Sequence, residues 1–373
     1  FFNYDYSSNA FFRLINPQKM FPAPKPFYLN SLSGNIHILG GQKTNISIIA
    51  QPNIPDTLFL QLMPNQASTQ KRDSLKLIFH SIPDSQGIFH FELPELFQDY
   101  SYQAVFNARY FWEAWENVTS EIDTIFVTDR PVFEKFLLTT IPPQYSKLNK
   151  TTHEGNVAMV EGLKGSIIQV DIESNRMLEN AYIHKNDTKL EMASNYNNAS
   201  GYFKLTEEGS FTVNIVDKRG ITNRDPIAYK LNILPDYKPN ITIIEPSSLT
   251  ELGDNQTIPI HFEISDDYGF TNLQLAYEIH RPYYLENDPY VVMFNIDDLS
   301  PDSTTQTIKM FWDLTDLLLM PDDEVHFHFE LTDNDNISGP KKTISDKLII
   351  KVPSLIDLYN KIEESEKNII EDI

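Results

Sequence analysis

The feature that most constrains the fold is a strict alternation of apolar and polar residues along several short stretches. Two of the most regular stretches are 258–264 and 325–331, where His261 and Glu263 face away from the apolar residues. Successive side chains of a β-strand point to opposite faces, so this period of two predicts strands with one buried face. The alternating apolar residues are Ile258, Ile260, Phe262 and Ile264, then Leu273, Leu275, Tyr277 and Ile279, then Val325, Phe327, Phe329 and Leu331.

Two proline-containing breaks, at 128–131 and 234–239, divide the strand-like stretches. They lie about 100 residues apart, which is the size of one immunoglobulin-type sandwich. Segments 100–108, 211–217 and 325–333 each resemble a penultimate strand that is followed by a polar loop and a closing strand, which indicates a tandem repeat. The alternative is one large β domain with inserts. We predict an all-β chain of three tandem immunoglobulin-like antiparallel β-sandwiches, at 26–128, 131–235 and 239–353.

The two ends of the chain depart from the strand pattern. Residues 1–25 contain an apolar run with prolines, which predicts an extended lead-in that packs on the first domain. Residues 354–373 carry apolar residues at helical spacing among many Glu and Lys, with Ser354 as N-cap, which predicts the start of an amphipathic helix or coiled coil. Self-association through this helix is one expectation. The chain starts with Phe1 and ends inside the predicted helix, so we expect a piece of a longer protein.

The charge balance and the missing residue types narrow the function classes. The formal net charge is −22 and no Lys/Arg cluster interrupts it, whereas nucleic-acid binding requires a basic face. There is no cysteine, which excludes disulfides and cysteine nucleophiles. No apolar window approaches the length of a membrane span. No nucleophile elbow, phosphate loop or dinucleotide turn is present, so we expect no enzyme and no cofactor apart from a calcium hypothesis.

The calcium hypothesis rests on two acidic loops of the third predicted sandwich. Asp266 and Asp267 follow one strand, and Asp333 and Asp335 follow another. In an immunoglobulin-like sandwich such loops lie at the same end, and Ca²⁺ binds six to eight hard oxygen atoms of the kind that these side chains offer. The alternative is that these are ordinary turn residues whose side chains cap the local backbone.

A second metal hypothesis concerns histidines on one strand face. His326 and His328 alternate with apolar residues, and His280 ends the neighbouring predicted strand. Two histidines at positions i and i+2 of a strand match a zinc geometry. The alternative is a solvated sheet face that carries imidazoles.

Aromatic residues in a predicted loop supply the third candidate site. Trp112 and Trp115 fall in the predicted loop before the last strand of the first domain. Such residues stack on sugars or anchor a protein partner. The alternative is that they cover the junction to the next domain.

Several phrases in a fixed order carry a resemblance to a known family. They are Ile-Pro-Pro-Gln-Tyr-Ser-Lys-Leu at 141–148, Asp-Tyr-Lys-Pro-Asn-Ile at 236–241, Ser-Asp-Asp-Tyr-Gly-Phe at 265–270, Leu-Thr-Asp-Asn-Asp-Asn-Ile-Ser-Gly-Pro-Lys at 331–341, and Pro-Ser-Leu from Pro353. Their order resembles a family of large bacterial envelope proteins described as a domain of unknown function. The resemblance implies a membrane anchor in segments outside this chain, immunoglobulin-like domains on the extracytoplasmic (periplasmic) side, and a helical, low-complexity C-terminal region.

Two functional hypotheses follow from these patterns. The first is a non-enzymatic cell-envelope scaffold whose immunoglobulin-like domains bind other envelope proteins in a membrane-associated assembly. The alternative is a carbohydrate- or peptidoglycan-binding adhesive module that calcium stiffens. The scaffold hypothesis predicts copurifying proteins, and the adhesive hypothesis predicts glycan binding that is lost in Trp112→Ala.

Overall fold

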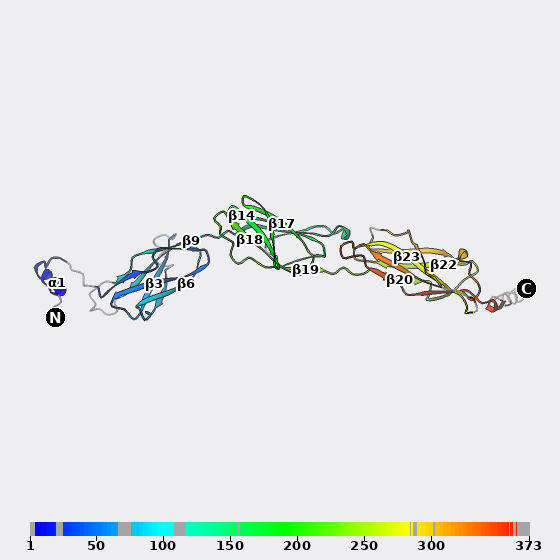
Figure 1. Cartoon of the computed structure of the whole chain (residues 1–373), viewed down its shortest axis with the longest axis horizontal. Helices are drawn as coiled ribbons and strands as arrows, with labels where there is room; N and C mark the ends of the chain where they lie inside the picture. Colours follow the sequence, from blue (N-terminus) through cyan, green and yellow to red (C-terminus); the bar gives the residue numbers. More distant parts are fainter. Residues whose placement is uncertain are drawn as a thin grey trace, which may run out of the picture. The chain divides into compact units, whose positions relative to one another are not determined.

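Strands dominate the computed structural model (Figure 1). It describes residues 4–19, 25–65, 76–107, 117–155, 157–283, 285, 289–300, 303–357, 359–360 and 363. In these ranges the strands form six sheets, and most neighbouring strands are antiparallel. The chain divides into two compact units. Unit 1 holds residues 1–132 with 219–225, and unit 2 holds residues 133–218 with 226–373.

Unit 1 contains one pair of sheets. The first sheet has the order β1 (Phe27–Ser31), β3 (Gln42–Pro52) and β6 (Ile88–Leu96). The second has the order β2 (Ile36–Leu39), β9 (Asp123–Thr128), β7 (Tyr100–Phe106), β4 (Leu58–Pro64) and β5 (Leu77–Ser81), and β8 (Val118–Thr119) also pairs with β7. Strand β2 runs parallel to β9, whereas the other pairs are antiparallel.

Unit 2 contains two further pairs of sheets, of which the first is built from residues 133–234. One sheet has the order β11 (Thr151–Glu154), β10 (Phe133–Ile141), β13 (Ile167–Ser174), β17 (Asn198–Lys204) and β16 (Ala193–Asn195). The other has the order β12 (Met159–Leu163), β19 (Tyr229–Leu234), β18 (Gly209–Asp217), β14 (Leu178–Lys185) and β15 (Thr188–Glu191). Strand β12 runs parallel to β19, and the short 3-10 helix η2 (Gln144–Ser146) follows β10.

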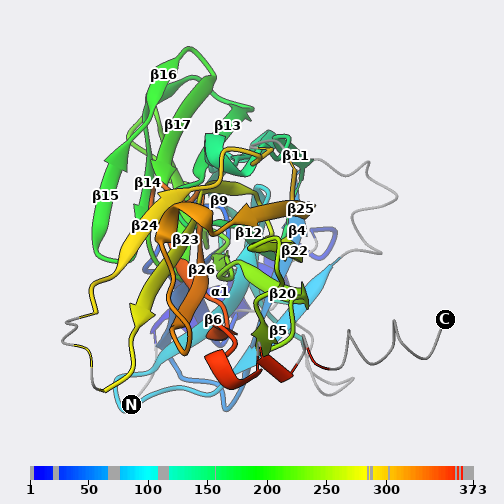
Figure 2. The ribbon, with the colours of Figure 1, turned by 90° about the vertical axis from the view of Figure 1, so that its right-hand side faces the viewer.

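The last pair of sheets in unit 2 is built from residues 240–351. One sheet has the order β20 (Asn240–Glu245), β22 (Thr257–Ser265) and β25 (Thr305–Asp313). The other has the order β21 (Leu249–Glu251), β28 (Leu348–Lys351), β26 (Glu324–Asp333), β23 (Phe270–His280) and β24 (Val292–Asn295), and β27 (Lys342–Ile344) also pairs with β26. Figure 2 shows β23 between β24 and β26. Strand β21 runs parallel to β28, and the 3-10 helix η3 (Thr315–Leu317) follows β25.

The strand order identifies each pair of sheets as an immunoglobulin-like sandwich. In the first pair of unit 2, the first, second, fourth and fifth strands of the fold (β10, β13, β16, β17) share one sheet, and the third, sixth and seventh (β14, β18, β19) share the other. This is the division of strands in immunoglobulin domains. In the described residues, the other two pairs repeat it without a strand that corresponds to β16. The prediction of an all-β, immunoglobulin-like sandwich fold is therefore confirmed.

Each sandwich encloses its own hydrophobic cluster, as the alternating pattern requires. The four apolar residues predicted to face inward from β26 are completely buried, and those of β22 are at most 2% exposed. On β23, Leu273 and Leu275 are buried as predicted, whereas Tyr277 and Ile279 are only partly buried near the end of the strand. The strand predictions for this region are thus confirmed.

The N-terminal segment differs from its predicted extended form. Residues Tyr4–Ile15 form the helix α1, which Pro17 follows closely. The first 16 residues contain neither Pro nor Gly, and the prolines of the segment start at Pro17, so nothing in the run opposes a helix. Phe11, Phe12 and Leu14 are more than half exposed, so they do not pack on the first sandwich as predicted.

At the C-terminal end, a few residues after Ser354 are helical. The Ser354 hydroxyl accepts the backbone N–H of Asp357 at 3.1 Å, and the Asp357 carboxylate accepts the backbone N–H of Ser354 at 3.2 Å, which is a reciprocal N-cap. Residues 355–357, 359–360 and 363 are helical, and the rest of the predicted helix lies outside the described residues. In the part of the chain that the structure describes, no helix combines the length and the apolar character that crossing a membrane needs.

Candidate functional site

The two acidic loops of the last sandwich meet, as the sequence predicts. One loop joins β22 to β23, and the other follows β26. The Asn334 side-chain amide in the second loop donates a hydrogen bond to the backbone carbonyl of Tyr268 in the first, at 2.7 Å. Burial raises the pKa of Asp266, and the charges of Asp333 and Asp267 raise it further, although backbone N–H groups oppose the shift. The loops therefore share one electrostatic environment.

Lys341 is the centre of this environment. Its ammonium nitrogen lies 2.9 Å from a carboxylate oxygen of Asp333, 3.2 Å from one of Asp335 and 2.9 Å from one of Asp236. The side chains of Asp333 and Asp335 are only 1% and 2% exposed. Burial alone would lower the pKa of Lys341, but its hydrogen bonds to the carboxylates outweigh this and raise the pKa above the ordinary value. The lysine thus stays charged and neutralises part of the acidic set.

The remaining predicted calcium ligands have other roles. One carboxylate oxygen of Asp266 accepts the backbone N–H groups of Tyr268 and Gly269, both at 2.9 Å. One oxygen of Asp267 accepts the backbone N–H of Tyr237 at 3.0 Å. The Asp266 contacts are the local backbone cap that the alternative interpretation predicts, whereas Asp267 binds the backbone of the segment that connects the two sandwiches of unit 2. Calcium binding stays a prediction, and binding between Asp333 and Asp335 would require the Lys341 ammonium to leave.

The same cluster joins the two sandwiches of unit 2, which the sequence did not indicate. The Tyr145 hydroxyl, in η2 of the first of these sandwiches, donates to the second carboxylate oxygen of Asp236 at 2.7 Å. Burial and then the Asp236 carboxylate raise the pKa of Tyr145. Asn334 also donates to the Tyr145 carbonyl at 3.1 Å, and the Tyr145 ring packs edge-on against Tyr268 with the ring centres 6.1 Å apart. We call Tyr145, Asp236, Asp333, Asn334, Asp335 and Lys341 the junction cluster.

Apolar and backbone contacts extend the junction. Gly165 has a φ of +91°, and a Cβ atom there would lie 2.7 Å from Cγ2 of Ile337. Ile337 therefore packs directly against the turn between β12 and β13. On the other side, the Thr343 hydroxyl donates to the carbonyl of Pro239 in the connecting segment. The connection between the two sandwiches is thus held at three places.

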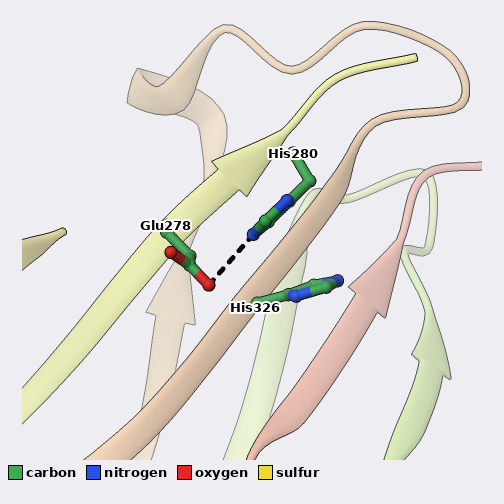
Figure 3. Close-up of side chains that lie close together, drawn as sticks. All are labelled: Glu278, His280 and His326. Atoms are coloured by element: carbon green, nitrogen blue, oxygen red, sulfur yellow. Dashed lines mark ion pairs between the residues drawn. The ribbon is translucent and has the colours of Figure 1, made fainter. Parts of the chain in front are cut away.

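Two of the three predicted zinc residues, His280 and His326, lie together at one end of the sheet that contains β23 and β26. Figure 3 shows His280 and Glu278, both from β23, turned toward His326 of β26. The His280 Nε2 atom lies 2.9 Å from Oε1 of Glu278, and the His280 and His326 rings stack with their centres 4.1 Å apart. One possible ligand atom of each of the three residues lies within 4.8 Å of the others. We call these three residues the histidine cluster.

His328, the third predicted zinc residue, is outside this cluster. It lies opposite Ala276 in the register of β23 and β26, and its Nε2 atom is 3.4 Å from a carboxylate oxygen of Glu330. Glu330 in turn forms an ion pair with Lys342. Glu278, and not His328, is the third residue of the histidine cluster, because the antiparallel register places Glu278 directly opposite His326. Only the pairing of two distant strands reveals this, so the sequence alone did not indicate Glu278.

Two charged groups border the histidine cluster. Oε2 of Glu324 lies 2.9 Å from Nε2 of His326, and Nζ of Lys347 lies 2.8 Å from Oε1 of Glu278. The contact with the Lys347 ammonium, followed by that with the His280 ring, lowers the pKa of Glu278 to about 2. Glu278 is therefore ionised at neutral pH. The predicted partner-binding residues Trp112 and Trp115 lie outside the described residues.

No family model and no curated protein matches the chain. Among solved structures, dimeric latent PorU from Porphyromonas gingivalis is 10% identical, with 88% of this chain and 34% of PorU covered and a TM-score of 0.19. The fibronectin(III)-like modules of Clostridium thermocellum CbhA are 12% identical, with 52% of this chain and 88% of theirs covered and a TM-score of 0.20. Trypsin-activated alpha-2-macroglobulin from Escherichia coli is 11% identical, with 89% and 24% covered and a TM-score of 0.22. This chain spans about a third of the length of PorU. At such scores the function has to be argued from the chain itself.

Proposed function

We propose that this chain is a non-enzymatic scaffold of the bacterial cell envelope. In this proposal three immunoglobulin-like domains follow one another along the chain on the extracytoplasmic side, a C-terminal helix follows them, and segments outside this chain anchor the protein in the membrane. The domains bind other envelope proteins in a membrane-associated assembly. The resemblance described for the sequence supports the location and the anchor, and the repeated sandwich topology supports the tandem domains.

The observation that carries the proposal is the junction cluster. A freely jointed string of domains needs only a polar linker between its members. Here an ammonium ion, three carboxylates, a tyrosine hydroxyl and an asparagine amide meet where the connecting segment passes from one sandwich to the next. Buried charged groups of this kind are costly unless all of them are paired, so the arrangement favours one fixed junction. A fixed spacing between binding surfaces is what a scaffold requires.

The glycan-binding alternative has no comparable support among the described residues. Its aromatic residues, Trp112 and Trp115, lie outside them. In the loops that this alternative predicts calcium to stiffen, the Lys341 ammonium already contacts both Asp333 and Asp335. We therefore favour protein partners.

The proposal can be tested by purifying the full-length protein from its native membranes in mild detergent and identifying what copurifies by mass spectrometry. Wild type would be compared with Lys341→Met, which removes the junction cation, and with Tyr145→Phe, which removes only one hydroxyl. Lys309→Met, at an exposed site on β25, is the matched control. Circular dichroism of each variant would verify that the sandwiches remain folded.

We expect the wild type and Lys309→Met to retain the same stoichiometric protein partners, and Lys341→Met to retain them several-fold less. Loss of the ammonium leaves two buried carboxylates without a counter-charge, a change that costs about 3–5 kcal/mol. If the wild type carries only polysaccharide, or nothing, the scaffold function is wrong. If Lys341→Met retains every partner fully, the junction is not what the function depends on.

A further inference from the structure

We propose that the histidine cluster is a binding site for a divalent transition metal of the zinc class. The ligands are Glu278, His280 and His326. Imidazole nitrogen and carboxylate oxygen are ligands that suit zinc, and two histidines with one glutamate form a known zinc ligand set. This site is distinct from the junction cluster, so the inference does not depend on the scaffold function.

The ring nitrogens of the two histidines are available for coordination. In His326, Nε2 contacts the carboxylate of Glu324 at 2.9 Å, which leaves Nδ1 as the free atom. Within the part of the chain that is described, Nδ1 of His326 is buried and has no hydrogen-bond partner. Nε2 of His280 lies 2.9 Å from Glu278 but lacks the geometry of a hydrogen bond. Two ring nitrogens therefore lie beside an ionised carboxylate without hydrogen bonds of their own. A metal cation could coordinate all three groups.

The surrounding structure places these ligands on rigid elements. Glu278 and His326 are directly opposite in the antiparallel ladder of β23 and β26, and His280 is two residues along on the same strand face as Glu278. Sites on strands are held more precisely than sites on loops. The contact between Glu324 and His326 matches the carboxylate partner that usually orients a metal-binding histidine. The metal therefore needs no rearrangement of the backbone.

The Lys347 ammonium would compete with the metal ion for the Glu278 carboxylate. Its ammonium contacts the same Glu278 oxygen as His280 does, and half of its side chain is exposed. A long, exposed lysine side chain readily turns into solvent, which frees the carboxylate for the metal. The three protein ligands then leave a fourth position for water. Removal of the lysine charge should accordingly strengthen metal binding.

The test is a titration of the whole, tag-free protein with Zn²⁺ by calorimetry and with Co²⁺ by visible absorption. We expect one site that binds the metal ion more tightly than the scattered surface carboxylates do. Co²⁺ bound at this site should show the strong visible absorption of a tetrahedral ion. His280→Ala and His326→Ala should each raise the dissociation constant at least tenfold. Glu324→Gln should raise it about tenfold, since partners of the ligands contribute about 10–100-fold.

Two variants separate this site from unspecific binding by histidines. His328→Ala removes an imidazole from the same strand but not from the cluster, so the dissociation constant should stay unchanged. Lys347→Gln should lower the dissociation constant, and a gain of affinity cannot arise from misfolding. The proposal is wrong if His328→Ala weakens binding as much as His326→Ala does, or if the Lys347→Gln and His280→Ala proteins bind like the wild type.

Discussion

Lys341 shows how one side chain decides the character of a site. The loops around it hold more negative than positive charge, and a calcium ion or a protein ammonium would each relieve that imbalance. An ammonium that belongs to the chain relieves it permanently and needs no metal supply. Burial alone would raise the pKa of Asp335, but the backbone N–H groups of Ser338 and Ile337 and then the ammonium lower it below its ordinary value. The Asp335 carboxylate is therefore held in its ionised form by groups of the chain itself.

A simpler acidic turn gives a prediction at the same scale. The pKa of Asp84 is lowered, mainly because its carboxylate accepts the backbone N–H of Ile88, at 2.9 Å, and then that of Gln86, at 2.8 Å. A carboxylate with a lowered folded-state pKa stabilises the fold above its unfolded-state value of about 3.8, and the stabilisation is lost as the pH falls through the folded-state value. Asp84→Asn should therefore be less stable than the wild type at pH 6.

The measurement is urea unfolding of both proteins across a pH series. The difference in the free energy of unfolding should be largest above pH 4 and should shrink as the pH falls below about 3.8. A difference that grows toward acid pH would show that the charge of Asp84 does not stabilise the turn.

The sequence predicted those features of residues that follow from a local pattern or from the topology of the sandwich. Ser354 as N-cap follows from a short pattern, the meeting of the two acidic loops follows from the predicted topology, and the structure contains both. Glu278 and Lys341 could not be assigned in this way. Glu278 meets His326 only through the register of β23 with β26. Lys341 contacts Asp333 and Asp335 of its own loop, but its contact with Asp236 depends on how the connecting segment meets the last sandwich.

Strand β26, which has strands of the same sheet on both sides, follows the alternation rule closely. Strand β26 pairs with β23, β27 and β28, and every inward side chain between Val325 and Leu331 is completely buried. The N-terminal segment shows the opposite case. Its apolar residues suggested packing in an extended form, yet a run of 16 residues without Pro or Gly forms α1, and its apolar side chains stay exposed.

The two faces of a strand should therefore differ sharply in their sensitivity to substitution. Phe329 is completely buried on β26, whereas Phe311 on β25 is 78% exposed. Phe329→Ala should lower the free energy of unfolding by about 3–5 kcal/mol, because it leaves a cavity in the core. Phe311→Ala, the matched control, should change it by about 0.5 kcal/mol or less. Chemical denaturation measures both, and similar losses for the two variants would contradict the assignment of the faces.

At the scale of the whole molecule, the division into two compact units predicts separate cooperative transitions. Differential scanning calorimetry of the wild-type chain should show at least two. Leu60→Ala, in the completely buried core of unit 1, should lower the midpoint of one transition, and Phe329→Ala should lower that of another. If either substitution shifts every transition equally, the units do not unfold independently.

The parallel pairings β2–β9, β12–β19 and β21–β28 have a mechanical consequence. In each sandwich, a strand near the beginning of the chain segment lies beside the strand that leaves it, and both run in the same direction. Tension applied to the two ends then pulls the paired strands past each other along their length. Their hydrogen bonds carry the load together and must break together, whereas a hairpin pulled open would lose them one by one. A chain built this way can be stretched between two attachment points and still keep its sandwiches folded.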